Sequence, residues 1–247
     1  MKVLIIIPAH NEEESLERVV DVLTETCPQY DYVVVNDGST DSTGEICERR
    51  HYNVINLSTN LGLAGAVHTG MKYALKKQYD MAIQFDADGQ HLPEYIEPMV
   101  HCMVENKCDI VIGSRYIGER MPVRMRTLGA RVLRAVIYLA TGEHIADPTS
   151  GMRLYSRRMI ECFAADASLA PEPDTLVYLM RQGAKVKEIK VHMEDRYSGQ
   201  SYLTPANAIK YMIHETMSIL VFQRFRKMLD LRCGQGGRKS QQRRIKS

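Results

Sequence analysis

The sequence lacks several features that would assign it to common protein classes. No apolar run approaches the roughly 20 residues that a membrane-spanning helix needs. The first residues lead directly into a predicted strand with no secretory signal ahead of them, so we expect a cytoplasmic protein unless something tethers it. The six cysteines form no Cys-x-x-Cys pair and no zinc-like spacing, which indicates free thiols in a reducing compartment.

Two common nucleotide-binding motifs are also missing. There is no Gly-x-x-x-x-Gly-Lys-[Ser/Thr] segment, and no Gly-x-Gly-x-x-Gly follows the first predicted strand, so a dinucleotide-binding Rossmann domain is disfavoured. The net charge of +2 gives little information on the class of protein, and the composition, 45% hydrophobic and 25% charged, is that of an ordinary globular protein. The 247 residues allow one large α/β domain, with or without a C-terminal appendage.

Short apolar runs rich in β-branched residues alternate with segments of helical spacing in the first half of the chain. The predicted strands are residues 2–7, 31–36, 53–57, a run that ends before 86, and 109–113. This alternation predicts a parallel sheet connected by right-handed crossovers and flanked by helices. Ligands bind outside the carboxyl ends of such strands, so the polar clusters after the first, second and fourth strands should meet at one rim.

The segment MAIQFDADGQH, residues 81–91, carries the strongest chemical pattern. Asp86 and Asp88 alternate at the end of an apolar strand, which predicts that both carboxylates project to the same side. Gly89 allows a sharp bend, and Gln90 follows on the same loop. Two carboxylates this close repel each other unless a cation lies between them, and oxygen ligands suit Mg²⁺ or Mn²⁺. The alternative for an isolated pair is an acidic turn that caps the next helix.

Seven motifs together resemble a known family. In chain order they are PAHNEEESL, VVVNDGSTDST, NLGLAGAVHTG, FDADGQH, IVIGSRYIGE, DPTSGMRLYSRR and EDRYSGQSYL. The first four resemble family 2 glycosyltransferases of the GT-A fold, an α/β fold whose Rossmann-like, mostly parallel sheet is flanked by helices. The last three are similar to the polyprenyl-phosphate glycosyltransferase branch, which includes dolichol-phosphate mannosyltransferase. The resemblance covers roughly residues 2–203 and implies a nucleotide-sugar donor, a divalent metal and inversion at the anomeric carbon.

The resemblance also implies roles for individual residues on the donor side. The metal would be held by Asp86, Asp88 and Gln90, and Asp37 would accept a hydrogen bond from the nucleobase. The residues that would bind the donor nucleotide together with Asp86 are Pro8, Asn11, Glu12, Asp37, Asn60 and Gly62. For Asn60 and Gly62, a helix N-cap with close packing is an equally good interpretation.

On the acceptor side, Arg115 directly follows the fifth predicted strand, where a guanidinium can hold a phosphate bidentately. In the resembled branch this arginine faces the acceptor phosphate. Residues 121–134 interleave arginines with apolar residues, a pattern that suits an anionic membrane surface or a lipid phosphate; the alternative is a solvated helix face packed on the sheet. We predict Arg126, Arg131 and Ser201 as further acceptor-phosphate residues.

The predicted catalytic residues are Asp88, Arg115, Arg196 and Asp174. Arg196 matches the first residue of the family's Arg-x-x-Gly-x-Ser-Lys loop, which closes over the phosphates, and we expect it to stabilise charge during transfer. Tyr202 replaces the lysine of that loop and so removes a cation. Asp174 lies where the family carries a glutamate on a helix; an acid there serves as general base for sugar-hydroxyl acceptors, whereas a phosphate acceptor is already anionic.

Asp147 in the DPTSGMR segment has three interpretations: it orients the acceptor, pairs with a neighbouring arginine, or stabilises the turn before the next strand. Residues 205–229 have strongly apolar helical spacing, and the end of the chain is basic. We therefore divide the chain into a GT-A domain (1–203), an amphipathic helical segment that can contact a membrane surface (204–232) and a basic disordered tail (233–247). A merely solubilising tail is the alternative, and with no nucleic-acid-reading module we expect no nucleic-acid partner.

Together these patterns predict a metal-dependent inverting glycosyltransferase, peripheral at the inner face of a membrane. It would move a sugar from a UDP- or GDP-sugar to polyprenyl phosphate. Two alternatives are transfer to a sugar hydroxyl during cell-surface polysaccharide synthesis, and a non-catalytic nucleotide-sugar-binding subunit. A membrane-protein partner and a homo-oligomer both remain open.

Overall fold

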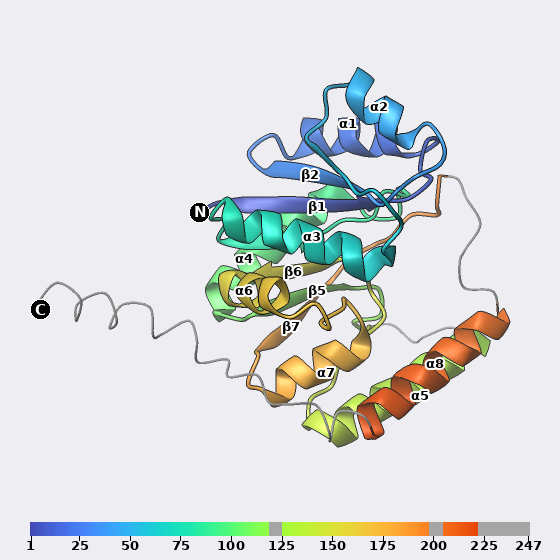
Figure 1. Cartoon of the computed structure of the whole chain (residues 1–247). Helices are drawn as coiled ribbons and strands as arrows, with labels where there is room; N and C mark the ends of the chain where they lie inside the picture. Colours follow the sequence, from blue (N-terminus) through green and yellow to red (C-terminus); the bar gives the residue numbers. More distant parts are fainter. Residues whose placement is uncertain (119–124, 198–204, 222–247) are drawn as a thin grey trace, which may run out of the picture.

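A seven-stranded sheet forms the centre of the computed structural model, which describes residues 1–118, 125–197 and 205–221, with side chains described outside 125–128 and 205–209 (Figure 1). The strand order is β3-β2-β1-β4-β6-β5-β7. The strands are β1 (Val3–Ala9), β2 (Asp31–Asn36), β3 (Val54–Asn56), β4 (Met81–Gln84), β5 (Ile110–Ser114), β6 (Arg153–Ser156) and β7 (Val186–Lys190). The five strands expected in the first half of the chain are therefore confirmed, with ends that shift by one or two residues.

The sheet is mixed rather than wholly parallel. Strand β6 pairs antiparallel with both β4 and β5, whereas the remaining pairs are parallel. After β5 the chain returns through a helix to the rim at which β5 ends, so the strand that starts there has to run in the opposite direction. The five strands expected from the sequence all run in the same direction, so the mostly parallel sheet is confirmed and β6 is its antiparallel member. The reversed direction of β6 also places the loop at residues 147–152 on the same rim as the loops that follow β1, β2 and β4.

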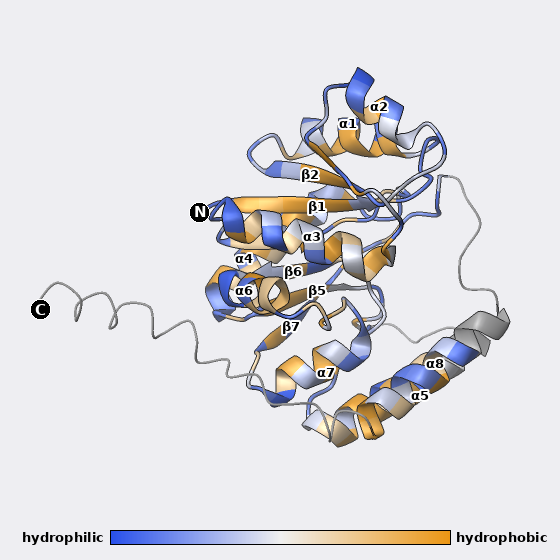
Figure 2. Ribbon diagram, viewed as in Figure 1, coloured by the Kyte–Doolittle hydropathy of each residue, from blue (hydrophilic) through white to orange (hydrophobic). Residues whose placement is uncertain are grey.

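Helices cover both faces of the sheet (Figure 1). Helices α1 (Leu16–Thr26), α2 (Thr43–Arg49) and α4 (Ile96–Asn106) pack on one face, and α3 (Gly62–Lys76), α6 (Arg157–Ala165) and α7 (Pro173–Arg181) pack on the other. A short 3₁₀ turn, η1 (Pro93–Tyr95), precedes α4. Strand β1 shows how the sequence specifies the layers, because Leu4 and Ile6 join one apolar cluster while Ile5 and Ile7 join the other. Figure 2 shows the apolar residues concentrated in these strands.

Two further helices, α5 (Met125–Thr141) and α8 (Pro205–Leu220), lie side by side beyond the edge of the sheet (Figure 1). They approach closely at Gly129, where an added Cβ would lie 2.7 Å from Cγ of Met212. Both helices also contact α7, which connects them to the sheet domain. The predicted helix at 205–229 is confirmed as far as Leu220, and residues 222–229 lie outside the described residues. No helix among the described residues has both the length and the apolarity to span a bilayer.

Candidate active site

The segment from Phe85 to His91, called here the acidic loop, follows β4 at the rim of the sheet. Strand β4 ends at Gln84, so Asp86 and Asp88 lie in a loop and not at alternate positions of a strand as expected. The Asp86 N–H donates to His91 Nδ1 at 2.9 Å, and His91 Nε2 lies 3.5 Å from Asp86 Oδ2. These partners identify the neutral tautomer of His91 that carries its proton on Nε2. His91 thereby fixes both the backbone and the carboxylate of Asp86.

Asp88 is almost fully buried, with 6% of its surface exposed. Burial raises the pKa of its carboxyl; the Gln90 N–H, which donates to Asp88 Oδ1 at 3.0 Å, acts in the opposite direction, and the charge of Asp86 raises the pKa further. Glu12 from the loop after β1 belongs to the same group of acids. Burial raises the pKa of Glu12, and although its hydrogen bond from Ser15 lowers it, the charges of Asp88 and Asp86 add to the increase. Three mutually repelling carboxylates make this a favourable place for a cation.

The oxygen-only character of this group fits Mg²⁺ or Mn²⁺. Asp86 and Asp88 are the carboxylates of the acidic loop, and Gln90 follows them with its backbone N–H on Asp88 and its side-chain oxygen on Arg196. Among the described residues, however, no three or more His, Cys, Asp or Glu side chains are arranged to enclose a metal ion on their own. A divalent cation here would therefore need further oxygen ligands, such as those of a diphosphate.

Arg196, in the segment after β7, lies directly against the acidic loop. Its Nε is 3.2 Å from Asp88 Oδ2 and donates to Gln90 Oε1 at 3.0 Å. Two backbone hydrogen bonds join the same segments: Glu194 N–H donates to the Gln90 carbonyl at 3.1 Å, and Tyr197 N–H donates to the Asp88 carbonyl at 3.0 Å. The structure therefore brings Arg196 to Asp88 and Gln90, which lie more than 100 residues earlier in the chain.

The loops after β1, β2 and β3 interlock beside the acidic loop. Asp37 is 3% exposed, and its Oδ1 accepts a hydrogen bond from Leu61 N–H at 2.7 Å. Asn11 Oδ1 accepts from Thr40 N–H at 2.8 Å, and Asn60 Oδ1 accepts from Gly62 N–H at 2.8 Å. The Asn60 side chain thus holds the turn that leads into α3, whose N-cap is Leu61, and an added Cβ at Gly62 would meet no neighbour within 4 Å. Pro8 and Glu12 complete the same rim on β1 and the loop that follows it.

Arg115 immediately follows β5 and forms a bidentate ion pair with Asp147. Arg115 Nε lies 2.7 Å from Asp147 Oδ2, and Nη2 lies 2.9 Å from Oδ1. Asp147 has no exposed surface, whereas 35% of the Arg115 side chain is exposed. The Glu188 carboxylate accepts the N–H groups of Ala146 and Asp147, which holds the loop itself. Of the three interpretations of Asp147, the structure shows the pairing with a neighbouring arginine and also a contact within the turn before β6, where Oδ1 accepts the Thr149 hydroxyl at 3.2 Å.

Asp174 lies in the first turn of α7 and contacts α8. Its Oδ2 accepts a hydrogen bond from Ser218 at 2.7 Å, and its N–H donates to Glu215 Oε2 at 3.1 Å. Glu172 joins this group by accepting a hydrogen bond from the Tyr211 hydroxyl. Burial raises the pKa of Glu215 to about 7, and the charges of Asp174 and Glu172 add to the increase. The acid predicted as a general base is therefore part of a helix–helix contact.

The remaining predicted acceptor residues are less well defined. Arg131 lies on the exposed surface of α5. Ser201 and Tyr202 lie outside the described residues, and so does the side chain of Arg126.

Sequence reasoning missed two residues that organise the rim. His10 Nδ1 lies 2.9 Å from the Asp37 carbonyl and His10 Nε2 lies 2.9 Å from Asn60 Nδ2, so one ring connects the loops after β1, β2 and β3. Gln84, 1% exposed, donates from Nε2 to Asp86 Oδ1 at 3.0 Å. A polar side chain in an otherwise apolar strand was the signal that could have identified Gln84. His10 stands inside the first motif and had no comparable signal.

The sequence comparisons agree with this arrangement of loops. Residues 4–163 match the model of glycosyl transferase family 2. The chain belongs to this family. It is a glycosyltransferase, and the matched residues include the donor loops and the acidic loop.

Two relatives come from the branch that the later motifs resemble. The chain is 30% identical over 216 residues to an undecaprenyl-phosphate mannosyltransferase of Micrococcus luteus, with 83% of this chain and 88% of the relative covered. It is 28% identical over 220 residues to a polyprenol monophosphomannose synthase of Mycolicibacterium smegmatis, with 83% and 82% covered. These relatives confirm the resemblance of this glycosyltransferase to the polyprenyl-phosphate branch.

A structural comparison confirms the GT-A fold. Glucosyl-3-phosphoglycerate synthase from Mycobacterium tuberculosis, solved with Mn²⁺, uridine diphosphate and glucosyl-3-phosphoglycerate, matches this glycosyltransferase with a TM-score of 0.64. The match covers 90% of this chain and 79% of the other at 19% identity. At this identity the likeness shows the fold alone.

Proposed function

We propose that this glycosyltransferase moves a sugar from a UDP- or GDP-sugar to polyprenyl phosphate, with inversion at the anomeric carbon. The observation that carries the proposal is the presence of two arginines on the rim that bears the acidic loop. Arg196 contacts Asp88, and Arg115 is held at the end of β5 by the buried Asp147. An acceptor phosphate is an anionic nucleophile, so it needs cations to position it and no base to activate it. The two relatives described above, which act on polyprenyl phosphates by name, support the same acceptor.

On the donor side, Asp37 uses Oδ1 to hold Leu61, which leaves Oδ2 for a nucleobase N–H. Asn11 and Glu12 would lie against the base and ribose, with Asn60 and Gly62 nearby. Asp86 and Asp88 would hold Mg²⁺ or Mn²⁺, with Gln90 beside them. When bound, such an ion supplies Lewis-acid stabilisation of the departing nucleoside diphosphate. The raised pKa of Asp88, caused by burial and by Asp86, supports a cation as the natural partner of this pair.

On the acceptor side, Arg115 is well placed to bind a phosphate because Asp147 fixes its guanidinium while about a third of the side chain stays exposed. Arg196 would stabilise the negative charge that accumulates on the leaving diphosphate. Asp174 is engaged by Ser218 and Glu215 of α8, so a structural role fits it better than that of a general base. This arrangement favours a phosphate acceptor over a sugar hydroxyl.

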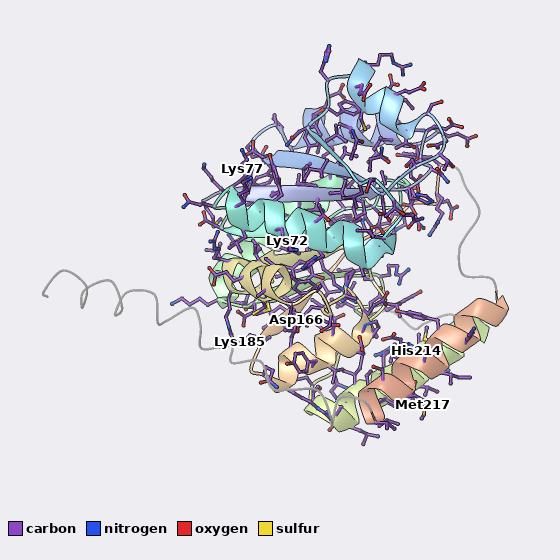
Figure 3. All side chains as sticks on the ribbon, viewed as in Figure 1. Lys72, Lys77, Asp166, Lys185, His214 and Met217 are labelled. Carbon is purple, nitrogen blue, oxygen red and sulfur yellow. The ribbon has the colours of Figure 1, made fainter. Side chains whose placement is uncertain are left out.

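The helices α5 and α8 support peripheral contact with a membrane surface. Each carries large apolar side chains in contact with solvent, and they lie beyond the sheet edge together with His214 and Met217 of α8 (Figure 3). On α8 these side chains recur at helical spacing, and Leu139 of α5 is 79% exposed. Figure 2 shows apolar and polar residues mixed along both helices. The exposed apolar residues of the pair are Val132, Tyr138, Leu139, Ile213, Met217 and Leu220. Such a surface with basic residues nearby suits the interface of an anionic bilayer.

The proposed function is tested by measuring nucleoside diphosphate release from a panel of UDP- and GDP-sugars with Mn²⁺, with and without a short polyprenyl phosphate. We expect one donor whose turnover rises strongly when the lipid is added. Release that is unaffected by the lipid but stimulated by saccharides would move the assignment to a sugar-hydroxyl acceptor. If no donor of the panel is turned over under any condition, the non-catalytic binding subunit becomes the better account.

A further inference from the structure

The segment that carries Arg196, residues 193–197, is attached to the acidic loop by more than the Arg196 side chain. Two backbone hydrogen bonds run between the segments, from Glu194 to Gln90 and from Tyr197 to Asp88. They align the backbones of the two segments but do not fix the position of a side chain. The Tyr197 side chain also contacts the acidic loop.

The Tyr197 ring lies against the bend of the acidic loop. Gly89 has φ +83°, and a Cβ built there would lie only 2.2 Å from Cδ2 of the Tyr197 ring. The ring thus occupies the space that a side chain at position 89 would need. Glycine is required here both for its left-handed backbone and for the close approach of the ring.

Arg18 of α1 completes this contact. Its guanidinium carbon lies 4.0 Å from the centroid of the Tyr197 ring, within the range of a cation–π interaction. Three segments far apart in the chain therefore meet at one aromatic ring: α1, the acidic loop and the segment after β7. Tyr197 is 37% exposed, so the contact adds little to the hydrophobic core. Tyr197 is the next residue in the chain after Arg196, so a contact that holds the ring also restrains the backbone that carries Arg196.

Asp88 shows why the position of Arg196 matters. Asp88 Oδ1 accepts the Gln90 N–H, and Oδ2 faces Arg196 Nε at 3.2 Å. A divalent cation held by Asp88 would compete with Arg196 for the negative charge of this carboxylate. Because the backbone of residues 194–197 is anchored, the guanidinium could turn away from Asp88 and still remain at the site.

We propose that Tyr197, with Arg18 over its ring and Gly89 beneath it, is the positioning residue that holds Arg196 at the acidic loop. Arg18 has no contact with Asp88 or Gln90 in the described residues, so it acts only through the ring. The inference rests on the proposed function for the catalytic importance of Arg196. The docking of residues 193–197 on the acidic loop, however, does not depend on which acceptor is used. The two are therefore tested separately.

Docking is tested by fluorescence, because the chain contains no tryptophan. Tyr197→Trp introduces the only tryptophan of the chain, which can be excited selectively and retains a ring for Arg18 to cover. We compare its quenching by acrylamide with and without Arg18→Gln. We expect the quenching constant to rise about twofold when Arg18 is replaced, because the ring loses its cover. Arg49→Gln is the matched control: it removes an exposed arginine that pairs with Glu17 of α1 and should change nothing. Equal quenching with and without Arg18 would overturn the proposal.

A kinetic measurement separates positioning from general loosening of the fold. Arg18→Gln should lower kcat about threefold to fivefold, with the donor KM and the thermal unfolding midpoint unchanged. Tyr197→Phe should retain the wild-type rate because the ring remains, whereas Tyr197→Ala should lose as much as Arg18→Gln. The Tyr197→Ala, Arg18→Gln double variant should lose no more than either single variant, since both act through one contact. Multiplicative losses in the double variant would contradict the proposal. If the wild type turned over no donor, the proposed function would fail while the quenching result still decided the docking.

Discussion

Replacing Asp147 with asparagine should weaken the fold through its partner Arg115. Asp147 is fully buried and accepts four hydrogen bonds, from Arg115 Nε, Nη2 and N–H and from the Thr149 hydroxyl. Asparagine has nearly the same shape but no charge, and its NH₂ group would face a donor. Breaking a buried ion pair costs about 3–5 kcal/mol. Because about a third of the Arg115 side chain is exposed to water, we expect a smaller loss of about 2–3 kcal/mol.

The assay is equilibrium unfolding in urea followed by circular dichroism, since the chain has no tryptophan to report by fluorescence. A double-mutant cycle with Asp147→Asn and Arg115→Met isolates the interaction, which we expect to contribute about 2 kcal/mol of coupling. The control is the exposed pair of Arg50 with Asp21, whose closest contact is 2.6 Å. Both of its side chains are 39% exposed, so its coupling should be clearly smaller than that of the buried pair. Equal coupling in the two pairs would refute the reasoning from burial.

Four further changes follow from the same structure. Asp88→Asn should abolish metal-dependent turnover while the thermal unfolding midpoint stays within about 3 °C of the wild type, and a fully active variant would contradict the metal assignment. Asp174→Asn should keep most of the transfer to polyprenyl phosphate; an inactive but folded variant would instead identify a general base. Burial and the neighbouring acids raise the pKa of Glu215 from 4.5 to about 7, so its protonation stabilises the fold fully below pH 4.5 and this stabilisation is lost as the pH rises through 7. The glutamine of Glu215→Gln does not titrate, so the free energy of unfolding of this variant, measured in urea, should rise by about 1–3 kcal/mol relative to the wild type between pH 4.5 and 8. A difference that does not change with pH would argue against the raised pKa of Glu215. Ile213→Glu should reduce sedimentation with phosphatidylglycerol vesicles, and Val104→Glu, on an exposed site of α4, is its control; equal binding by both variants would remove α8 from the membrane contact.

The rim of the sheet was predictable because it depends on local patterns. Buried strands are recognisable as short apolar runs, and the residues after their carboxyl ends must meet whatever the details of packing. Asp37, Asp86 and Asp88 were located by that reasoning alone, and the family resemblance then added roles for them. The direction of β6 was not predictable in the same way, because the sequence of a four-residue strand does not indicate whether it runs parallel or antiparallel to its neighbours.

Contacts between distant segments could not be predicted from the sequence. Nothing in the chain shows that Arg18 lies over Tyr197, because a cation–π pair has no spacing or composition of its own. Glu215 was expected only as part of an amphipathic helix, yet burial against α7 makes it the partner of Asp174. In each case the side chain acquires its role from a neighbour that only tertiary packing supplies.

The most direct test of the account is the identity of the product. Purified protein would be incubated with the preferred nucleotide sugar, labelled in the sugar, together with Mn²⁺ and a short polyprenyl phosphate. The account predicts a labelled lipid that extracts into organic solvent, carries its sugar through a phosphate with inverted anomeric configuration, and is absent with Asp88→Asn. A label that appears in a saccharide, or in a lipid with retained configuration, would contradict it.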